Sequence, residues 1–141
     1  MKRGNAEKRP SRNAQRHHRM NYTITIKGRL PGANEYIEAC RKNRYEAARM
    51  KRETQELIRL QIYRLPKLTK PVKIAFRWIE PNARRDYDNI TYGRKFILDA
   101  LQEAGKLPND NRKYVRGFSD EFAVDKDDPR IEMRIEEIKD V

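Results

Sequence analysis

Alternating apolar and polar residues predict strands at four places along the chain. Residues 22–27 (YTITIK), 72–78 (VKIAFRW) and 131–136 (IEMRIE) each place apolar side chains at every second position. This period of two is typical of a strand with one buried face. A further strand is predicted over residues 114–122, with an interruption at Gly117. The four segments together predict one small sheet.

Apolar residues at helical spacing predict two helices between these strands. Asn43, followed three residues later by a glutamate, resembles a capping box that opens a helix, and this helix must end before Pro66. A second helix is predicted over residues 89–104, with Gly105 as its C-terminal cap. Residues 29–36 are expected to form a loop. The predicted fold is α/β (α+β), with the order β-α-β-α-β-β and a small sheet covered by two helices.

Length and hydrophobic content indicate a single domain. The chain has 141 residues, of which 37% are hydrophobic, enough for one core but not for two. No apolar run approaches the roughly 18 residues that a membrane span needs, so we expect no membrane partner. Cys40 is the only cysteine, which excludes an internal disulfide and favours a reducing compartment. The expected location is cytoplasmic.

The chain is strongly basic. It has 33 Lys and Arg residues against 21 Asp and Glu residues, a formal net charge of +12. Such an excess favours a polyanionic partner, with nucleic acid as the first candidate. Residues 1–19 hold seven cations opposed only by Glu7, and almost no large apolar side chain. We therefore predict a disordered basic arm over residues 1–20, ahead of a domain over residues 21–141. The alternative is a solubilising tail without a partner.

Two aspartates stand out in the run Arg84-Arg85-Asp86-Tyr87-Asp88-Asn89 (RRDYDN). In an extended segment, residues two apart point to the same side, so both carboxylates can address one cation. Oxygen ligands of this kind suit Mg²⁺, which prefers one or two carboxylates together with water and phosphate. Two alternatives remain open: Asp88 caps the helix that begins at Asn89, and the arginines only balance charge.

Two further residues extend this candidate site. Lys95 lies two turns into the predicted second helix, and Asp110 follows that helix, before the next predicted strand. We expect a helix that leaves and a strand that returns to bring Asp110 back to Asp86 and Asp88.

In this order and spacing, these residues resemble the RusA family of Holliday junction resolvases. Those proteins are small, mostly phage-encoded, dimeric, Mg²⁺-dependent endonucleases. The resemblance covers most of the chain, from Tyr22 to Ile138, and omits the basic arm. It implies a single mixed β-sheet with two helices. The segments that carry it are Pro31 and Asn34, Asp86-Tyr87-Asp88-Asn89, Lys95, Leu98-Asp99-Ala100-Leu101, Ala104-Gly105 and Asn109-Asp110.

The resemblance also implies a role for individual residues. Asp86, Asp88 and Asp110 match the family's metal-binding acidic residues, and Lys95 matches its catalytic lysine. The stretch 89–95 (NITYGRK) is three residues longer than the family's commonest form. Arg94 is therefore a rival for the role of Lys95.

One more departure and one further assignment concern acidic positions. Asn109 stands where the family has a first aspartate, so we take Asp110 as the essential one. Asp99 lies in the motif, but it has an alternative role in capping or pairing within the helix, and we place it outside the catalytic set.

The expected reaction is hydrolysis of a DNA phosphodiester by metal-activated water, with Mg²⁺ as cofactor. Arg84, Arg85, Arg94 and Asn34 are expected to contact DNA, together with the basic arm. A four-way junction has approximate two-fold symmetry, which favours a homodimer with two matching sites. The alternative is a basic protein that binds branched DNA or RNA without catalysis.

Overall fold

The computed structural model describes residues 20–138, so the predicted basic arm lies almost entirely outside the described residues. Each predicted strand is confirmed, with its ends shifted by at most two residues. In chain order the elements are β1 (Asn21–Lys27), α2 (Ala33–Lys42), α3 (Arg44–Ile62), β2 (Val72–Glu80), α4 (Tyr87–Thr91), α5 (Gly93–Glu103), β3 (Val115–Val124) and β4 (Arg130–Glu137).

The strands form one mixed sheet in the order β1-β4-β2-β3. β4 runs antiparallel to both β1 and β2, whereas β3 runs parallel to β2. In the parallel pair, Val72 lies opposite Val115 and Glu80 lies opposite Val124. The C-terminal ends of β2 and β3 therefore meet at the same end of the sheet. The single mixed sheet expected from the sequence is confirmed.

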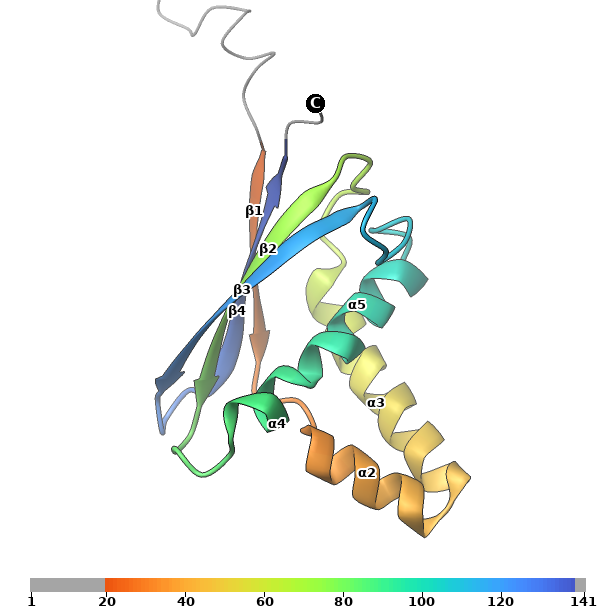
Figure 1. Cartoon of the computed structure of the whole chain (residues 1–141), viewed down its shortest axis with the longest axis vertical. Coiled ribbons are helices and arrows are strands. Elements are labelled where there is room, and N and C mark those ends of the chain that lie inside the picture. Colours follow the sequence, from red (N-terminus) through yellow and green to blue (C-terminus); the bar gives the residue numbers. More distant parts are fainter. Residues whose placement is uncertain (1–19, 139–141) are drawn as a thin grey trace, which may run out of the picture.

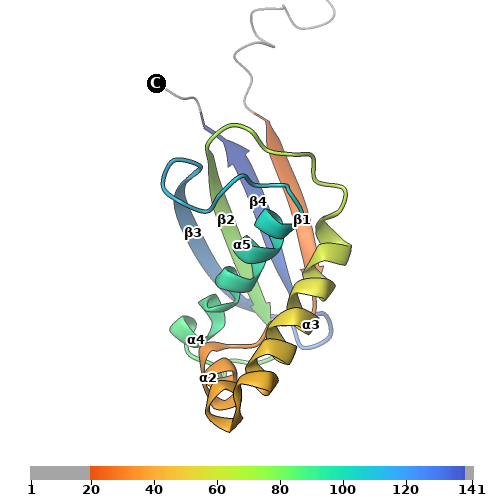
Figure 2. The same cartoon turned by 90° about the vertical axis from the view of Figure 1, so that its right-hand side faces the viewer.

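The helices form a second layer on one face of the sheet. α3 and α5 lie across this face, and α2 and α4 lie near the end where β2 and β3 finish (Figures 1 and 2). On β2, Val72, Ile74, Phe76 and Trp78 are buried, while Lys73 and Arg77 between them are exposed. The alternation seen in the sequence thus separates a core face from a polar face.

Capping at two predicted helix ends is confirmed. The Asn43 side-chain oxygen accepts a hydrogen bond of 2.9 Å from the backbone N–H of Glu46, and α3 begins at the next residue. Gly105 follows α5 with a φ of +73°, a conformation that glycine adopts at little cost. None of the helices over residues 20–138 is long and apolar enough to cross a membrane.

The helical content is larger than predicted, and the observed order is β-α-α-β-α-α-β-β. The loop predicted over residues 29–36 is wrong from Ala33 onward, because α2 begins there. Its start is stabilised by Glu35, whose carboxylate accepts a 2.9 Å hydrogen bond from the backbone N–H of Gly32. An acid three residues after the first capping position is the signal that the loop prediction missed.

The predicted second helix, residues 89–104, is divided into α4 and α5 at Tyr92. Gly93 begins α5 at a point where the Leu30 side chain approaches closely, since a Cβ added at Gly93 would lie 3.2 Å from it. The break therefore coincides with tight packing of α5 against the segment that follows β1. No local sequence pattern indicates this tertiary contact. It accounts for the division of the single predicted helix into α4 and α5.

Candidate functional site

The two aspartates of the DYDN run lie just beyond the C-terminal end of β2. Asp86 has an extended backbone and is the residue before α4, whereas Asp88 lies in the first turn of α4. The run is thus not extended throughout, so the same-side argument from a strand does not apply to this pair. Both side chains are exposed, and neither carboxylate forms a hydrogen bond or ion pair within residues 20–138.

This geometry decides the capping alternative. Asp88 lies inside α4 and does not precede it, and the Asp86 side chain makes no capping hydrogen bond. The interpretation that Asp88 caps this helix is therefore wrong. Neither carboxylate is paired with a cation in the described part of the chain, and both are exposed to solvent.

Asn89 connects this run to the segment after β1. Its side-chain oxygen accepts a 2.9 Å hydrogen bond from the backbone N–H of Asn34, near the start of α2. A Cβ added at Gly32 would lie 2.3 Å from the same oxygen, so a larger residue there would require the Asn89 side chain to move. The early loop and the acidic run, which the resemblance links, are in direct contact. Asn34 contributes its backbone to this contact, and its side chain is exposed.

Arg85 anchors the loop that carries Asp86. Its Nε and Nη2 donate to the two carboxylate oxygens of Glu80 at 2.9 and 2.7 Å, and its Nη1 donates to the Leu30 carbonyl at 3.1 Å. The Arg85 side chain is only 12% exposed. Its guanidinium is thus occupied within the fold, in contrast to the DNA contact expected from the sequence. Arg84, whose side chain is exposed, forms no ion pair within the described residues.

Glu80 is the partner that holds this loop, and no sequence pattern singled it out. It lies at the C-terminal end of β2, 5% exposed, and it also accepts a 2.8 Å hydrogen bond from Arg29. Burial alone would raise the pKa of Glu80, but the hydrogen bonds and charges of Arg85 and Arg29 outweigh burial and lower its pKa. Glu80 is therefore an ionised, structural carboxylate.

Arg94 is also occupied by the fold. Its Nη2 donates to Asp120 on β3 at 2.6 Å, and its guanidinium carbon lies 4.5 Å from the centre of the Phe118 ring. Asp120 also accepts a hydrogen bond of 2.8 Å from the Trp78 indole N–H. This network joins α5 to β2 and β3. Arg94 is therefore held by contacts within the fold, and its side chain is 22% exposed.

Lys95 has the exposure that Arg94 lacks. Its side chain is 63% exposed, and its Nζ lies 3.8 Å from Asp99, one helical turn further along α5. Asp99 also lies 3.7 Å from the Lys51 ammonium on α3. The pairing role considered for Asp99 is thus confirmed. Between the two rivals, Lys95 is the cation that remains available to a ligand.

Asp110 lies at the other end of the sheet. It precedes Val115, which is opposite Val72 at the start of β2, whereas Asp86 follows the end of β2. Nine residues of strand separate these ends, a span of about 26 Å at roughly 3.3 Å per residue. α5 runs from the end of the sheet near α4 toward the opposite end, where the connection to β3 lies (Figures 1 and 2). The expectation that the chain brings Asp110 back to Asp86 and Asp88 is not met within one copy.

The donor set available in one copy is therefore two carboxylates. Over residues 20–138, no group of three or more His, Cys, Asp or Glu side chains is arranged to hold a metal ion. Mg²⁺ does not require one, because it is commonly held by one or two carboxylates together with water and a substrate phosphate. Asp86 and Asp88 fit that requirement in chemical type and in exposure.

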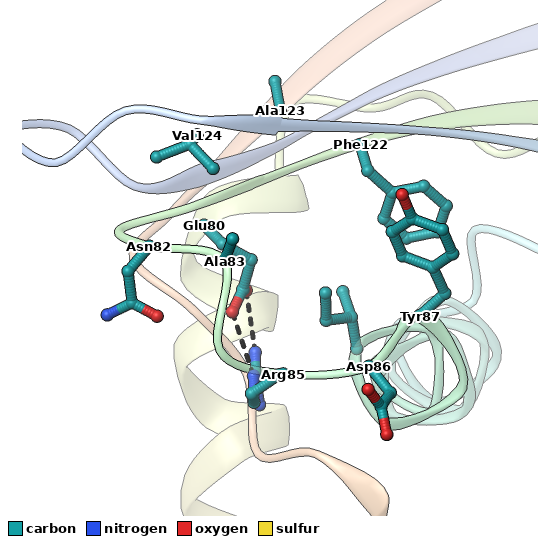
Figure 3. Close-up of a pocket in the computed structure, with 10 residues that line it drawn as sticks. Glu80, Asn82, Ala83, Arg85, Asp86, Tyr87, Phe122, Ala123 and Val124 are labelled. Atoms are coloured by element: carbon teal, nitrogen blue, oxygen red, sulfur yellow. Dashed lines mark hydrogen bonds and ion pairs between the residues drawn. The ribbon is translucent and has the colours of Figure 1, made fainter.

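A cavity of about 360 Å³ opens beside Asp86, between the loop after β2 and the end of β3. Tyr87 and Phe122 form one wall with their rings stacked, 4.1 Å between centroids (Figure 3). The ion pair between Glu80 and Arg85 lies on another side (Figure 3). The lining residues are Glu80, Asn82, Ala83, Arg85, Asp86, Tyr87, Ile90, Phe122, Ala123 and Val124.

Comparison with known proteins does not assign the chain to a family. No protein-family model matches it, and no curated protein matches it either.

Proposed function

We propose that this chain is a Mg²⁺-dependent endodeoxyribonuclease that resolves four-way (Holliday) DNA junctions by paired nicks. The observation that carries the proposal is the exposed, unpartnered state of Asp86 and Asp88 in a chain of net charge +12. Exposed carboxylates oppose DNA binding unless a cation lies between them and the phosphate. The resemblance of the surrounding run to RusA resolvases supports the same reaction.

In this proposal each side chain has a distinct task. Asp86 and Asp88 hold Mg²⁺, which when bound supplies an activated water and neutralises charge on the scissile phosphate. Lys95, exposed at the start of α5, stabilises negative charge that develops on a phosphate oxygen. Arg84 contacts the DNA backbone, and Arg85 keeps the loop in place through Glu80. The arm supplies sequence-independent attraction to phosphates.

A homodimer completes the proposal. Two matching sites suit the two-fold symmetry of a junction that must be cut twice. If Asp110 binds metal, as the resemblance implies, it joins Asp86 and Asp88 from the second copy, because about 26 Å of sheet separates them within one copy. Each site of such a dimer would combine residues of both copies.

The first test is cleavage of a labelled four-way junction and of a matched duplex, with and without Mg²⁺. Asp88→Asn should abolish Mg²⁺-dependent nicking and keep junction binding, because it removes the charge and preserves the size of the side chain. Glu53→Gln, which removes an exposed acid on α3, is the matched control and should cut as the wild type does. Junction binding by a wild-type protein that never nicks would reject the nuclease and favour the non-catalytic alternative.

Mixed dimers test the shared site. Consider a dimer with one Asp88→Asn copy and one Asp110→Asn copy. If each site combines Asp88 of one copy with Asp110 of the other, both substitutions fall in the same site and the second site is intact. We expect single nicks from the mixture, whereas each variant alone is inactive. An inactive mixture, with exchange of copies verified by mass spectrometry, would show that each site uses acids from one copy only.

A further inference from the structure

Tyr87 lies between the two candidate metal ligands and is a large aromatic residue outside the hydrophobic core. Its side chain is 65% exposed, although one face of its ring stacks on Phe122 with an interplanar angle of 20°. The opposite face is therefore open to solvent. A large aromatic side chain that packs on one face and is free on the other is well suited to stack with a flat ligand.

The cavity beside Tyr87 offers room for such a ligand. Its volume of about 360 Å³ lies within the range of small-molecule sites, and its walls combine apolar side chains with polar groups. The one buried carboxylate in the wall, Glu80, is already balanced by Arg85 and Arg29, so it does not repel a nucleotide. Figure 3 shows the aromatic pair on one side of this space and the loop carrying Arg85 on the other.

We infer that Tyr87 and this cavity bind one unpaired nucleobase of the DNA substrate, stacked on the exposed face of the Tyr87 ring. The inference rests on the proposed function and specifies how that site recognises its substrate. Bases within a continuous duplex are already stacked on their neighbours, whereas a base displaced at a branch point has a free face. Since Asp86 and Asp88 flank Tyr87, the bound base belongs to a nucleotide next to the phosphate at the carboxylates.

This arrangement selects branched DNA without reading sequence. Stacking on an aromatic ring tolerates every base, because each base has a π-face. The net charge of +12 draws duplex and branched DNA alike. The additional stacking contact is therefore the part of the binding energy that only an unpaired base provides.

The test compares two single strands with equal numbers of phosphates: an oligothymidylate and an oligomer of the same length made of abasic sites. Binding is measured by fluorescence anisotropy in Mg²⁺, so that a cation is available to Asp86 and Asp88, and gel electrophoresis checks that both oligomers stay intact. Loss of aromatic stacking weakens binding by about fivefold to about a hundredfold per base. We expect a preference for the oligothymidylate of this size in the wild type.

Three variants locate the preference. Tyr87→Leu keeps an apolar contact with Phe122 but lacks a ring, so the preference should disappear, whereas Tyr87→Phe should retain it. Tyr45→Leu, at another exposed tyrosine on α3, should behave as the wild type. No preference in the wild type, or an equal preference in Tyr87→Leu, would overturn the inference. If Tyr87→Leu loses the preference and the wild type cleaves no junction, the nuclease proposal is rejected but the base-binding site is supported.

Discussion

Replacement of Arg85 by alanine tests whether a buried ion pair fixes the loop that carries Asp86. The substitution removes both hydrogen bonds from Arg85 to Glu80, at 2.9 and 2.7 Å, and leaves that carboxylate 5% exposed with Arg29 as its remaining partner. Loss of one partner from a buried pair costs about 3–5 kcal/mol. Because Arg29 stays, we expect the lower end, about 3 kcal/mol.

The assay is urea unfolding followed by circular dichroism, with thermal melts alongside. In a chain of this size each kcal/mol lowers Tm by roughly 3–5 °C, so Arg85→Ala should lower it by about 10 °C. Arg49→Ala is the matched control, because Arg49 pairs with Glu46 on the exposed surface of α3. Exposed pairs contribute about 0–1 kcal/mol.

The result that would refute the reasoning is a loss for Arg85→Ala no larger than that for Arg49→Ala. The Glu80 contact would then not stabilise the fold, and Arg85 would again be available as a DNA contact. A large loss in stability, with unchanged junction affinity of the folded protein, supports the anchoring role instead.

Two further predictions concern α5 and pH. Lys95→Ala should slow junction cleavage strongly in single-turnover assays, with little change in junction affinity. Arg94→Ala should instead lower the free energy of unfolding by about 1–3 kcal/mol, because it removes a partner from the part-buried Asp120. If a fully stable Arg94→Ala variant cleaves slowly and Lys95→Ala cleaves normally, then Arg94 and not Lys95 is the cation that acts in cleavage. Since the fold lowers the pKa of Glu80 below its ordinary value of 4.5, the stability it contributes is fully present above pH 4.5 and is lost as pH falls through the lowered pKa. The difference in unfolding free energy between the wild type and Glu80→Gln, measured by urea titration, should therefore shrink from pH 7 to pH 3, and a constant difference would contradict the assignment.

The strands were predictable because each has one buried face. The alternation over residues 72–78 predicts a strand if one face of the strand packs on a core, and Ile74, Phe76 and Trp78 form that buried face of β2. The start of α3 was equally local, since the Asn43 side chain caps it. α2 was missed because its neighbourhood contains Pro31 and Gly32, which ordinarily mark a turn.

The site was predictable in its chemistry but not in its geometry. The spacing of Asp86 and Asp88 identified two carboxylates that the fold leaves exposed. Whether Asp110 returns to them depends on the parallel pairing of β2 and β3, which places the start of β3 at the far end of the sheet. Likewise, no local signal shows that Arg85 and Arg94 are occupied, because Glu80 and Asp120 become their partners only after folding.

The contact between Gly32 and Asn89 has an evolutionary consequence. Any side chain at position 32 collides with the Asn89 amide, whose oxygen would lie 2.3 Å from the new Cβ. A shorter residue at position 89 would remove this approach and forfeit the hydrogen bond to Asn34, and the Arg85 Nη1, 2.8 Å from the same Cβ, would still have to shift. Positions 32 and 89 are therefore expected to covary among descendants of this chain. Such covariation would report the contact between the start of α2 and the acidic run.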